Sequence, residues 1–236
     1  MKIASHVTRF AWWALCFLSL AGGARAETAD PEVLSPDRVV VVANRNAAGS
    51  LELARYYMRR RDIPEANLVL LAAAEEEEIG WNAFVETIHN PLLDLLFDDA
   101  WLEGERLLDQ DAYGRDQYSV AANHVGALVL CRGLPLKIKP FPLPEGTAGE
   151  IPGRLASPRA SVDTELATLP MTGSRVAGPL PNPLYRQLAP GADRSRNMIR
   201  VCRLDGPSDE KARALVDHAV KAESGGLRGR AYIDTG

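Results

Sequence analysis

The feature that most restricts the fold is a set of four short apolar segments that lack the polar alternation of a half-exposed strand. The segments are residues 39–43, 67–73, 125–130 and 198–201. A continuous apolar run of this length predicts a strand that is covered on both faces. Helical patterns separate the segments, and this alternation predicts an α/β fold with a doubly wound, mainly parallel sheet. Residues 231–234 indicate the start of a further strand, so we expect four to five strands.

Three stretches carry apolar residues at the i, i+3 and i+4 spacings of an amphipathic helix. The first covers residues 50–58. The second runs from residue 81 to Leu107 and is interrupted at Asn90 and Pro91, which predicts either two helices or one kinked helix. The third follows Pro207 and has the clearest stripe. That stripe comprises Ala212, Leu215, Val216, Ala219 and Val220.

The first 26 residues have the pattern of a secretory signal peptide. Lys2 and Arg9 precede an apolar stretch over residues 10–20, and Ala24-Arg25-Ala26 forms an A-x-A cleavage site. We therefore expect cleavage after Ala26 and export to the periplasm or the extracellular space. The apolar stretch is too short for a stable membrane span, so none is expected once the signal is removed.

The net charge argues against two classes of partner. The whole chain carries a formal charge of −4, and removing the signal peptide takes away three basic residues and no acidic one. Nucleic acids and anionic lipids are bound by basic patches. We therefore expect no nucleic-acid partner.

The remaining chain divides by composition. Residues 27–37 are expected to be a linker and residues 38–228 an α/β domain. Within that domain, residues 140–197 are rich in Pro, Gly, Ser and Arg, which predicts a long irregular insertion with one short helix at residues 163–169. Segments of this length without regular structure are usually functional. Residues 229–236 are expected to begin a second, truncated subdomain.

Several well-defined site motifs are missing from the sequence. It contains no G-x-G-x-x-G, no G-x-x-x-x-G-K-[ST], no G-x-S-x-G and no H-E-x-x-H. These motifs mark dinucleotide, phosphate, serine-hydrolase and zinc sites. The acidic residues near the predicted binding edge form no repeating D-x-D pattern, and this argues against a metal site. We therefore expect no cofactor and no metal.

The candidate binding residues follow from the predicted topology, because parallel sheets bind ligands beyond the carboxyl ends of their strands. Asp163 or Glu165 could face this crevice and receive a basic group of a ligand. Asp163 could equally cap the short helix that follows it, and Asp205 is most simply a helix cap. The candidate binding residues are Asn44, Arg132, Gly133, Asp163, Glu165 and Arg203.

The two cysteines of the mature chain stand at strand ends, and each is followed by an arginine. A thiol nucleophile needs an adjacent histidine, but His124 is predicted at the opposite end of the strand that ends in Cys131. His89 and His218 are interpreted as surface residues. A disulfide between Cys131 and Cys202 and two buried free thiols are equally compatible with the sequence. No catalytic residue is assigned within this chain.

An ordered set of motifs resembles an uncharacterised family of secreted bacterial proteins. The resemblance covers nearly all of residues 38–236 and implies an exported protein that continues beyond residue 236. That family tends to have Thr where this chain has its two strand-end cysteines, which argues against a nucleophilic role for them. The motifs are Tyr56-Tyr57 through Arg60, Ile63-Pro64, Asn67-Leu68, Arg132-Gly133-Leu134-Pro135-Leu136, Ser161-Val162-Asp163-Thr164-Glu165-Leu166 and Arg203-Leu204-Asp205-Gly206-Pro207.

The same order of motifs is distantly similar to the first α/β subdomain of gingipain-type cysteine peptidases. This likeness implies a caspase-like or flavodoxin-like sheet, with the catalytic His and Cys in a second subdomain. It also implies that Asp163 matches an acidic loop position of the substrate pocket. The expected function is therefore the non-catalytic half of an exported peptidase homologue with a peptide or protein ligand. The alternative is a non-enzymatic exported module that binds a ligand or protein.

Overall fold

A computed structural model gives the arrangement of the chain. It describes residues 34–142, 160–171, 173, 174, 176, 178 and 198–226, all within the second of the two units into which the chain divides, Leu34–Gly236. The expected signal peptide, the linker up to residue 33 and the further strand at residues 231–234 lie outside the described residues. Of the predicted insertion, the structure describes residues 140–142 and parts of the range 160–178.

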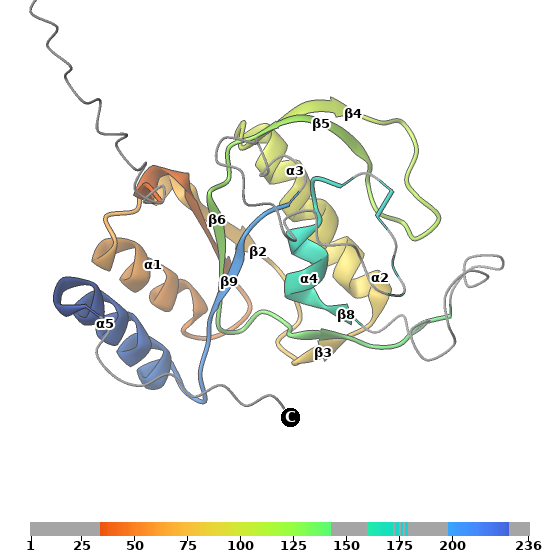
Figure 1. Cartoon of the computed structure of the whole chain (residues 1–236). Coiled ribbons are helices and arrows are strands. Elements are labelled where there is room, and N and C mark those ends of the chain that lie inside the picture. Colours follow the sequence, from red (N-terminus) through yellow and green to blue (C-terminus); the bar gives the residue numbers. More distant parts are fainter. Residues whose placement is uncertain are drawn as a thin grey trace, which may run out of the picture. The chain divides into compact units, whose positions relative to one another are not determined.

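The centre of the fold is a four-stranded sheet in which every neighbouring pair of strands is parallel (Figure 1). The strand order is β2-β1-β6-β9, so β2 and β9 are the outer strands. The predicted α/β fold with a mainly parallel sheet is confirmed. The strands are β1 (Val39–Asn44), β2 (Leu68–Leu71), β6 (Ala127–Cys131) and β9 (Val201–Leu204).

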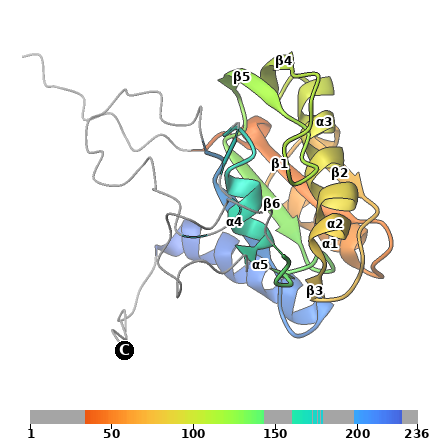
Figure 2. The same cartoon turned by 90° about the vertical axis from the view of Figure 1, so that its right-hand side faces the viewer.

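Both faces of the sheet are covered, because alternate residues of each strand enter two separate cores. Val40 and Val42 of β1 pack into the larger core, whereas Val39 and Val41 pack into the smaller one. The larger core contains residues of α2 (Trp81–Phe84), α3 (Asn90–Asp98) and α4 (Val162–Ala167). The smaller core contains residues of α1 (Ser50–Arg60) and α5 (Asp209–Gly225). Figure 2 views the molecule from the side of α2 and α3, with α1 behind them.

The helix that was expected to be interrupted at Asn90 and Pro91 is continuous. A π-helical stretch, η3 (Val85–His89), joins α2 directly to α3, and Pro91 stands in the first turn of α3. The predicted extension to Leu107 is wrong. The chain after α3 instead forms an antiparallel hairpin, β4 (Leu102–Arg106) and β5 (Tyr118–Asn123), and Leu107 is exposed beside it.

Three further short strands, not foreseen from the sequence, form a small second sheet. They are β3 (Glu78–Ile79), β7 (Lys137–Ile138) and β8 (Ala160–Ser161), in the order β3-β7-β8. Two single 3-10 turns, η1 (Pro36–Arg38) and η2 (Glu65–Asn67), precede β1 and β2. The short helix predicted at residues 163–169 is α4, which begins one residue earlier.

The helix caps differ from those proposed on sequence. Ser161 caps α4 by accepting a hydrogen bond from the backbone N–H of Thr164 at 3.1 Å, so Asp163 is not the cap. Ser208 caps α5 in the same way, so Asp205 is not the cap there. Both carboxylates are therefore left for other contacts.

The apolar stripe of α5 is only partly covered by the described residues. Ala212 and Val216 are buried, whereas Leu215 is 49% exposed. Polar contacts complete the packing of α5 against α1: the Tyr56 hydroxyl donates to Asp217 at 2.6 Å, and Arg60 pairs with the same carboxylate. No described helix is both long enough and apolar enough to cross a membrane.

Candidate functional site

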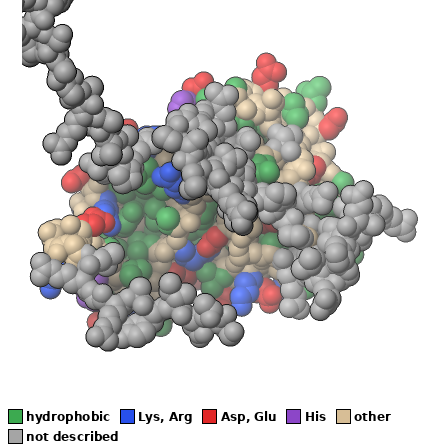
Figure 3. All heavy atoms as spheres, in the orientation of Figure 1, with side chains coloured by type: hydrophobic (Ala, Val, Ile, Leu, Met, Phe, Trp, Pro, Cys, Tyr) green, Lys and Arg blue, Asp and Glu red, His purple; other side chains and the backbone are tan. Residues whose placement is uncertain are grey.

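The carboxyl ends of β1, β2, β6 and β9 form one edge of the main sheet, which we call the strand-end edge. Five of the six candidate binding residues lie on or beside it, and Glu165 points elsewhere. On the face drawn in Figure 3, basic and acidic side chains lie interspersed around a hydrophobic area. The contacts of each candidate show what the edge is built from.

Asn44, the last residue of β1, joins three chain segments at this edge. Its side chain is fully buried. The Nδ2 amide donates to the carbonyl oxygens of Ala73, Ala74 and Gly133 at 3.2, 3.2 and 2.8 Å. The Oδ1 atom accepts from the backbone N–H groups of Asn46 and Ala73, both at 3.1 Å. Asn44 therefore fixes the loops that follow β1, β2 and β6 relative to one another.

Gly133 lies in the loop after β6, where the backbone has a φ of +95°. A Cβ atom at this position would stand 2.5 Å from the Cβ of Ala47, in the loop after β1. Both the left-handed backbone and the close approach require glycine. Its role here is to let the two loops meet beneath Asn44.

We expect Gly133→Ala to destabilise the fold by about 2 kcal/mol, because a strained φ and a steric overlap add together. Urea unfolding measures the change. Gly80→Ala is the matched control, since its φ is −74° and no atom stands within 4 Å of the added Cβ. Equal effects of the two substitutions would contradict this role of Gly133.

Arg203 and Asp163 form an ion pair that holds α4 against the edge. The guanidinium of Arg203 contacts both carboxylate oxygens of Asp163, one of them through Nε at 3.0 Å. It also donates to the carbonyl oxygens of Leu134 and Pro135, each at 2.9 Å. Arg203 is mostly buried and Asp163 is about a third exposed. Part of the Asp163 carboxylate is therefore accessible, but its charge is balanced from within the fold.

Arg132 turns away from Arg203, toward the start of α5. Its Nη1 lies 2.6 Å from Asp209 and its Nε donates to the carbonyl oxygen of Gly206 at 3.0 Å. Asp205 lies within 3.9 Å. The strand-end edge thus carries two separate ion pairs, one beside α4 and one beside α5.

Cys131 and Cys202 are both free, so the expected disulfide is not formed, but the alternative of two buried thiols holds for Cys131 only. They lie on neighbouring strands but differ in environment, since Cys131 is fully buried and Cys202 is exposed. Burial raises the pKa of the Cys131 thiol to about 12, which removes it as a nucleophile near neutral pH. In the described part of the chain, no contact joins either thiol to a histidine.

Thiol labelling should separate these two environments. We expect Ellman's reagent to modify Cys202 rapidly in the folded protein and Cys131 only after denaturant is added, because the buried thiol is both inaccessible and protonated. Mass mapping of the labelled peptides identifies the modified residue. The Cys202→Ser variant should lose the rapid reaction and Cys131→Ser should keep it. Rapid modification of Cys131 in the folded protein would overturn the assignment.

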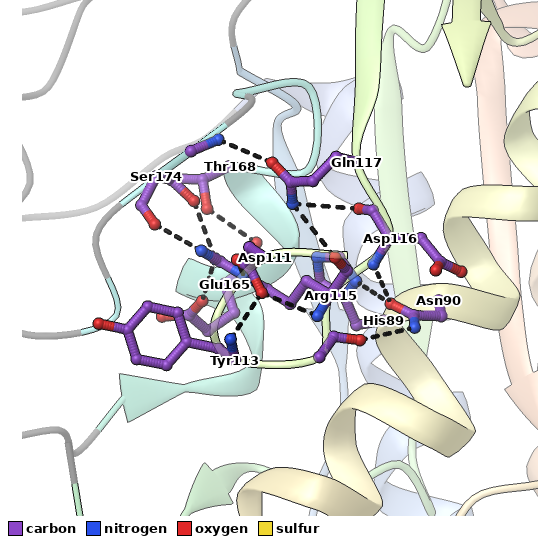
Figure 4. Close-up of polar contacts among 12 residues, drawn as sticks. His89, Asn90, Asp111, Tyr113, Arg115, Asp116, Gln117, Glu165, Thr168 and Ser174 are labelled. Atoms are coloured by element: carbon purple, nitrogen blue, oxygen red, sulfur yellow. Dashed lines mark hydrogen bonds and ion pairs between the residues drawn. The ribbon is translucent and has the colours of Figure 1, made fainter. Parts of the chain in front are cut away.

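A second polar cluster lies between the β4–β5 hairpin and α4, and its centre is the buried side chain of Arg115 (Figure 4). Its Nε donates to Asp111 at 2.7 Å. Its Nη1 and Nη2 donate to the hydroxyl and the carbonyl oxygen of Ser174 at 2.9 and 2.5 Å. The guanidinium also lies over the rings of Trp81 and Tyr113, at 5.8 Å from each centroid. These contacts compensate for the burial of its charge.

Glu165 faces this cluster rather than the strand-end edge, so the structure separates it from Asp163. It is 4% exposed, and its Oε2 lies 3.7 Å from Nη1 of Arg115 without a hydrogen-bond partner. Burial raises the pKa of this carboxyl to about 7, although Arg115 acts in the opposite direction. A carboxyl that exchanges a proton near neutral pH is a feature of many functional sites.

His89 belongs to the same cluster, so its interpretation as a surface residue is wrong. It is 5% exposed, and its Nδ1 lies 2.8 Å from Oδ1 of Asn90. Asn90 in turn accepts a hydrogen bond from the backbone of Asp116 and donates one to that of Gly114. The π-helical stretch ends at this point, and its last residue is buried. Burial lowers the pKa of His89 to about 4.

The shift of His89 predicts that its own contribution to stability is lost in acid. The unfolded chain binds a proton at a pKa of about 6.5, whereas the folded chain does so near 4. The contribution of His89 to the free energy of unfolding should therefore be complete above about pH 6.5 and fall by up to about 3 kcal/mol as the pH drops to 4. The raised pKa of Glu165 contributes a slope of the opposite sign between about pH 7 and about pH 4.5. The contribution of His89 is therefore the difference between the unmodified chain and His89→Gln, measured by urea unfolding at each pH. His218→Gln is the control, because His218 is exposed on α5. A curve that keeps its slope in His89→Gln would refute the assignment.

A small cavity opens beside Arg115. Its volume is about 10 Å³, which is room for one water molecule. His89, Thr168 and Ser174 contribute to its wall. Its size excludes a ligand larger than water in this conformation. Among the described residues, no group of three His, Cys, Asp or Glu side chains is placed to hold a metal ion.

The Arg115 cluster was not predicted from the sequence. Its one local signal is the Asp111-to-Arg115 turn, in which Oδ1 of Asp111 accepts from the backbone N–H groups of Tyr113 and Arg115. A short polar side chain that bonds to the backbone two residues ahead is typical of turns. The contacts with Glu165 and Ser174 join residues more than forty positions apart.

Comparisons of the chain with protein families, with curated proteins and with solved structures give no match.

Proposed function

We propose that this chain is an exported, non-catalytic α/β domain that binds a peptide or protein ligand at its strand-end edge. We further propose that it is the non-catalytic half of a caspase-like cysteine peptidase homologue. One observation carries the proposal. Four parallel strands bring Asn44, Arg132 and Arg203 to a single edge, while neither Cys131 nor Cys202 is arranged as a nucleophile.

The arrangement of the edge supports a binding role. Ligands of open parallel sheets bind beyond the carboxyl ends of the strands, near the point where the strand order reverses. Here that point lies between β1 and β6, where Asn44 meets Gly133. The accessible parts of Asp163 and Arg132 flank it, and polar groups of both signs suit a peptide, which carries both hydrogen-bond donors and acceptors.

The kinship with peptidases is tested on the full-length protein. It is incubated with a fluorogenic peptide that carries a basic residue, with and without iodoacetamide. Thiol-dependent cleavage that persists in Cys131→Ser and Cys202→Ser would support the proposal, because it would place the nucleophile outside these strands. Loss of cleavage in Cys202→Ser would contradict the non-catalytic role. Absence of thiol-dependent cleavage would remove the peptidase kinship.

A second candidate is a binding module without any enzymatic partner. It is favoured by the internal pairing of Arg203 with Asp163 and of Arg132 with Asp209, because these ion pairs stabilise a surface without preparing it for proton transfer. A rise in melting temperature on adding the same peptide, without cleavage, would support this candidate. Arg132→Ala should reduce that rise.

A further inference from the structure

The loop of the β4–β5 hairpin is fastened to the turn that follows α4. We call this contact the Arg115 clamp, formed by Arg115, Gln117, Gly173 and Ser174. Arg115 donates to both oxygen atoms of Ser174, and the backbone N–H of Gly173 donates to Oε1 of Gln117 at 3.1 Å. All three contacts join segments that are more than fifty residues apart in the chain.

Glu165 stands on the other side of the same guanidinium. Its Oε2 is buried and has no hydrogen-bond partner, and Nη1 of Arg115 is 3.7 Å away, too far for a hydrogen bond. A neutral carboxyl tolerates this position. A carboxylate is poorly stabilised there, because the ion pair with Arg115 lacks a hydrogen bond to offset the burial of the charge. The neighbouring guanidinium of Arg115 already donates its hydrogen bonds to Ser174 and Asp111.

The other charged groups around the cluster do not offer Glu165 a substitute. Asp111 has the same sign and already binds Nε of Arg115. His89, from η3, and Asp116, from the hairpin loop, line the same cavity, and His89 is directed to Asn90. Asp163, on α4 itself, is paired with Arg203. If Glu165 loses its proton, Arg115 is therefore the group that must move toward it.

We propose that Glu165 is a proton switch for the Arg115 clamp. With the carboxyl protonated, Arg115 stays on Ser174 and the clamp is closed. When the proton passes to water, the carboxylate draws the guanidinium toward itself and the contacts with Ser174 weaken. The raised pKa of Glu165, about 7, places this change within the neutral range.

Two measurements on the same sample test the switch. A carbon-13 NMR titration should show the Glu165 carboxyl changing state near pH 7. Between about pH 5.5 and about pH 8.5, the protection factor of the Gly173 amide should fall about tenfold, after correction for intrinsic exchange. A carboxyl that titrates near its ordinary value, or a Gly173 amide whose protection does not follow that titration, would overturn the proposal.

The variant Glu165→Gln supplies the matched control, because it keeps the shape of the side chain and cannot ionise. Protection of Gly173 should then be independent of pH across the same range. A pH dependence equal to that of the unmodified chain would show that another group controls the clamp. If this variant did not fold, the titration and exchange data on the unmodified chain would still decide the matter.

Discussion

Replacement of Arg115 by methionine is expected to destabilise the fold by about 3–5 kcal/mol, which is the effect of removing one partner from a buried ion pair. Arg115 is 3% exposed, and its removal leaves the carboxylate of Asp111 without its hydrogen bond at 2.7 Å. The contacts with Ser174 and the stacking over Trp81 are lost as well. Urea unfolding followed by circular dichroism measures the difference.

Two further variants show whether the effect belongs to the buried cluster. Arg106→Met is the control, because Arg106 pairs with Asp94 and Asp116 while its side chain is 57% exposed, and it should change stability far less. Asp111→Asn combined with Arg115→Met should restore part of the lost stability, since it removes the orphaned charge. A small effect of Arg115→Met, similar to that of Arg106→Met, would contradict the central role of this guanidinium.

Replacement of Asn44 is expected to have the second large effect. Asn44→Ala should destabilise the fold by about 2–4 kcal/mol, because several buried backbone groups lose their partner at once. The carbonyl oxygen of Gly133 and the backbone N–H of Ala73 depend on this side chain, and the carbonyl oxygen of Ala73 is shared between Asn44 and Asn46. A thermal melt and a urea titration measure the change.

Asn44→Asp gives a sharper test, since it preserves the size of the side chain. An aspartate loses the N–H donors, and it would place a buried charge next to the carbonyl oxygens that Asn44 now binds. Asn44→Asp should therefore destabilise the fold at least as much as Asn44→Ala, although it keeps the shape of the side chain. Asn46→Ala is the control, because Asn46 is exposed and its side chain makes one contact, with Ala73 at 3.0 Å. A mild effect of Asn44→Asp would show that the amide donors are dispensable.

The main sheet could be predicted because the uninterrupted apolar sequence of its strands indicates that they are buried. β1 is buried at all six positions and β6 at all five, which is what a run without polar residues indicates. The ends of parallel strands then place Asn44, Arg132 and Arg203 at one edge without further information. Sequence reasoning thus located Asn44 and Arg132 correctly, whereas Arg203, expected beyond a strand at residues 198–201, lies within β9. Whether these residues bind a ligand was left open.

The hairpin escaped prediction for the opposite reason. In β4, Leu102 is buried and the four following residues are exposed, so the strand has almost no apolar signal. Leu107 then suggested a helical position that does not exist. Short strands of this kind are fixed by pairing with a distant partner, here β5, which no local pattern reveals.

The contacts of the buried polar residues could not be predicted from the sequence either. His89 was interpreted as a surface residue because it lies next to the helix break predicted at Asn90 and Pro91, but the helix is continuous and places His89 in the cluster around Arg115. Glu165 and Asp163 stand two positions apart on α4 and so point in different directions, one to Arg115 and the other to Arg203. A helix over residues 163–169 already implies this separation, but the sequence does not reveal which arginine each carboxyl group meets, because Arg115 and Arg203 are distant in the chain.

The placement of α5 limits how the main sheet can be extended. α1 leads from β1 to β2, and α5 lies on the same face of the sheet as α1. Crossover connections between parallel strands are right-handed in about 98% of cases. A strand reached from α5 with that handedness would fall on the β6 side of β9, a position that β6 already occupies. A parallel strand that follows directly after α5 is therefore not expected to pair with the outer edge of β9.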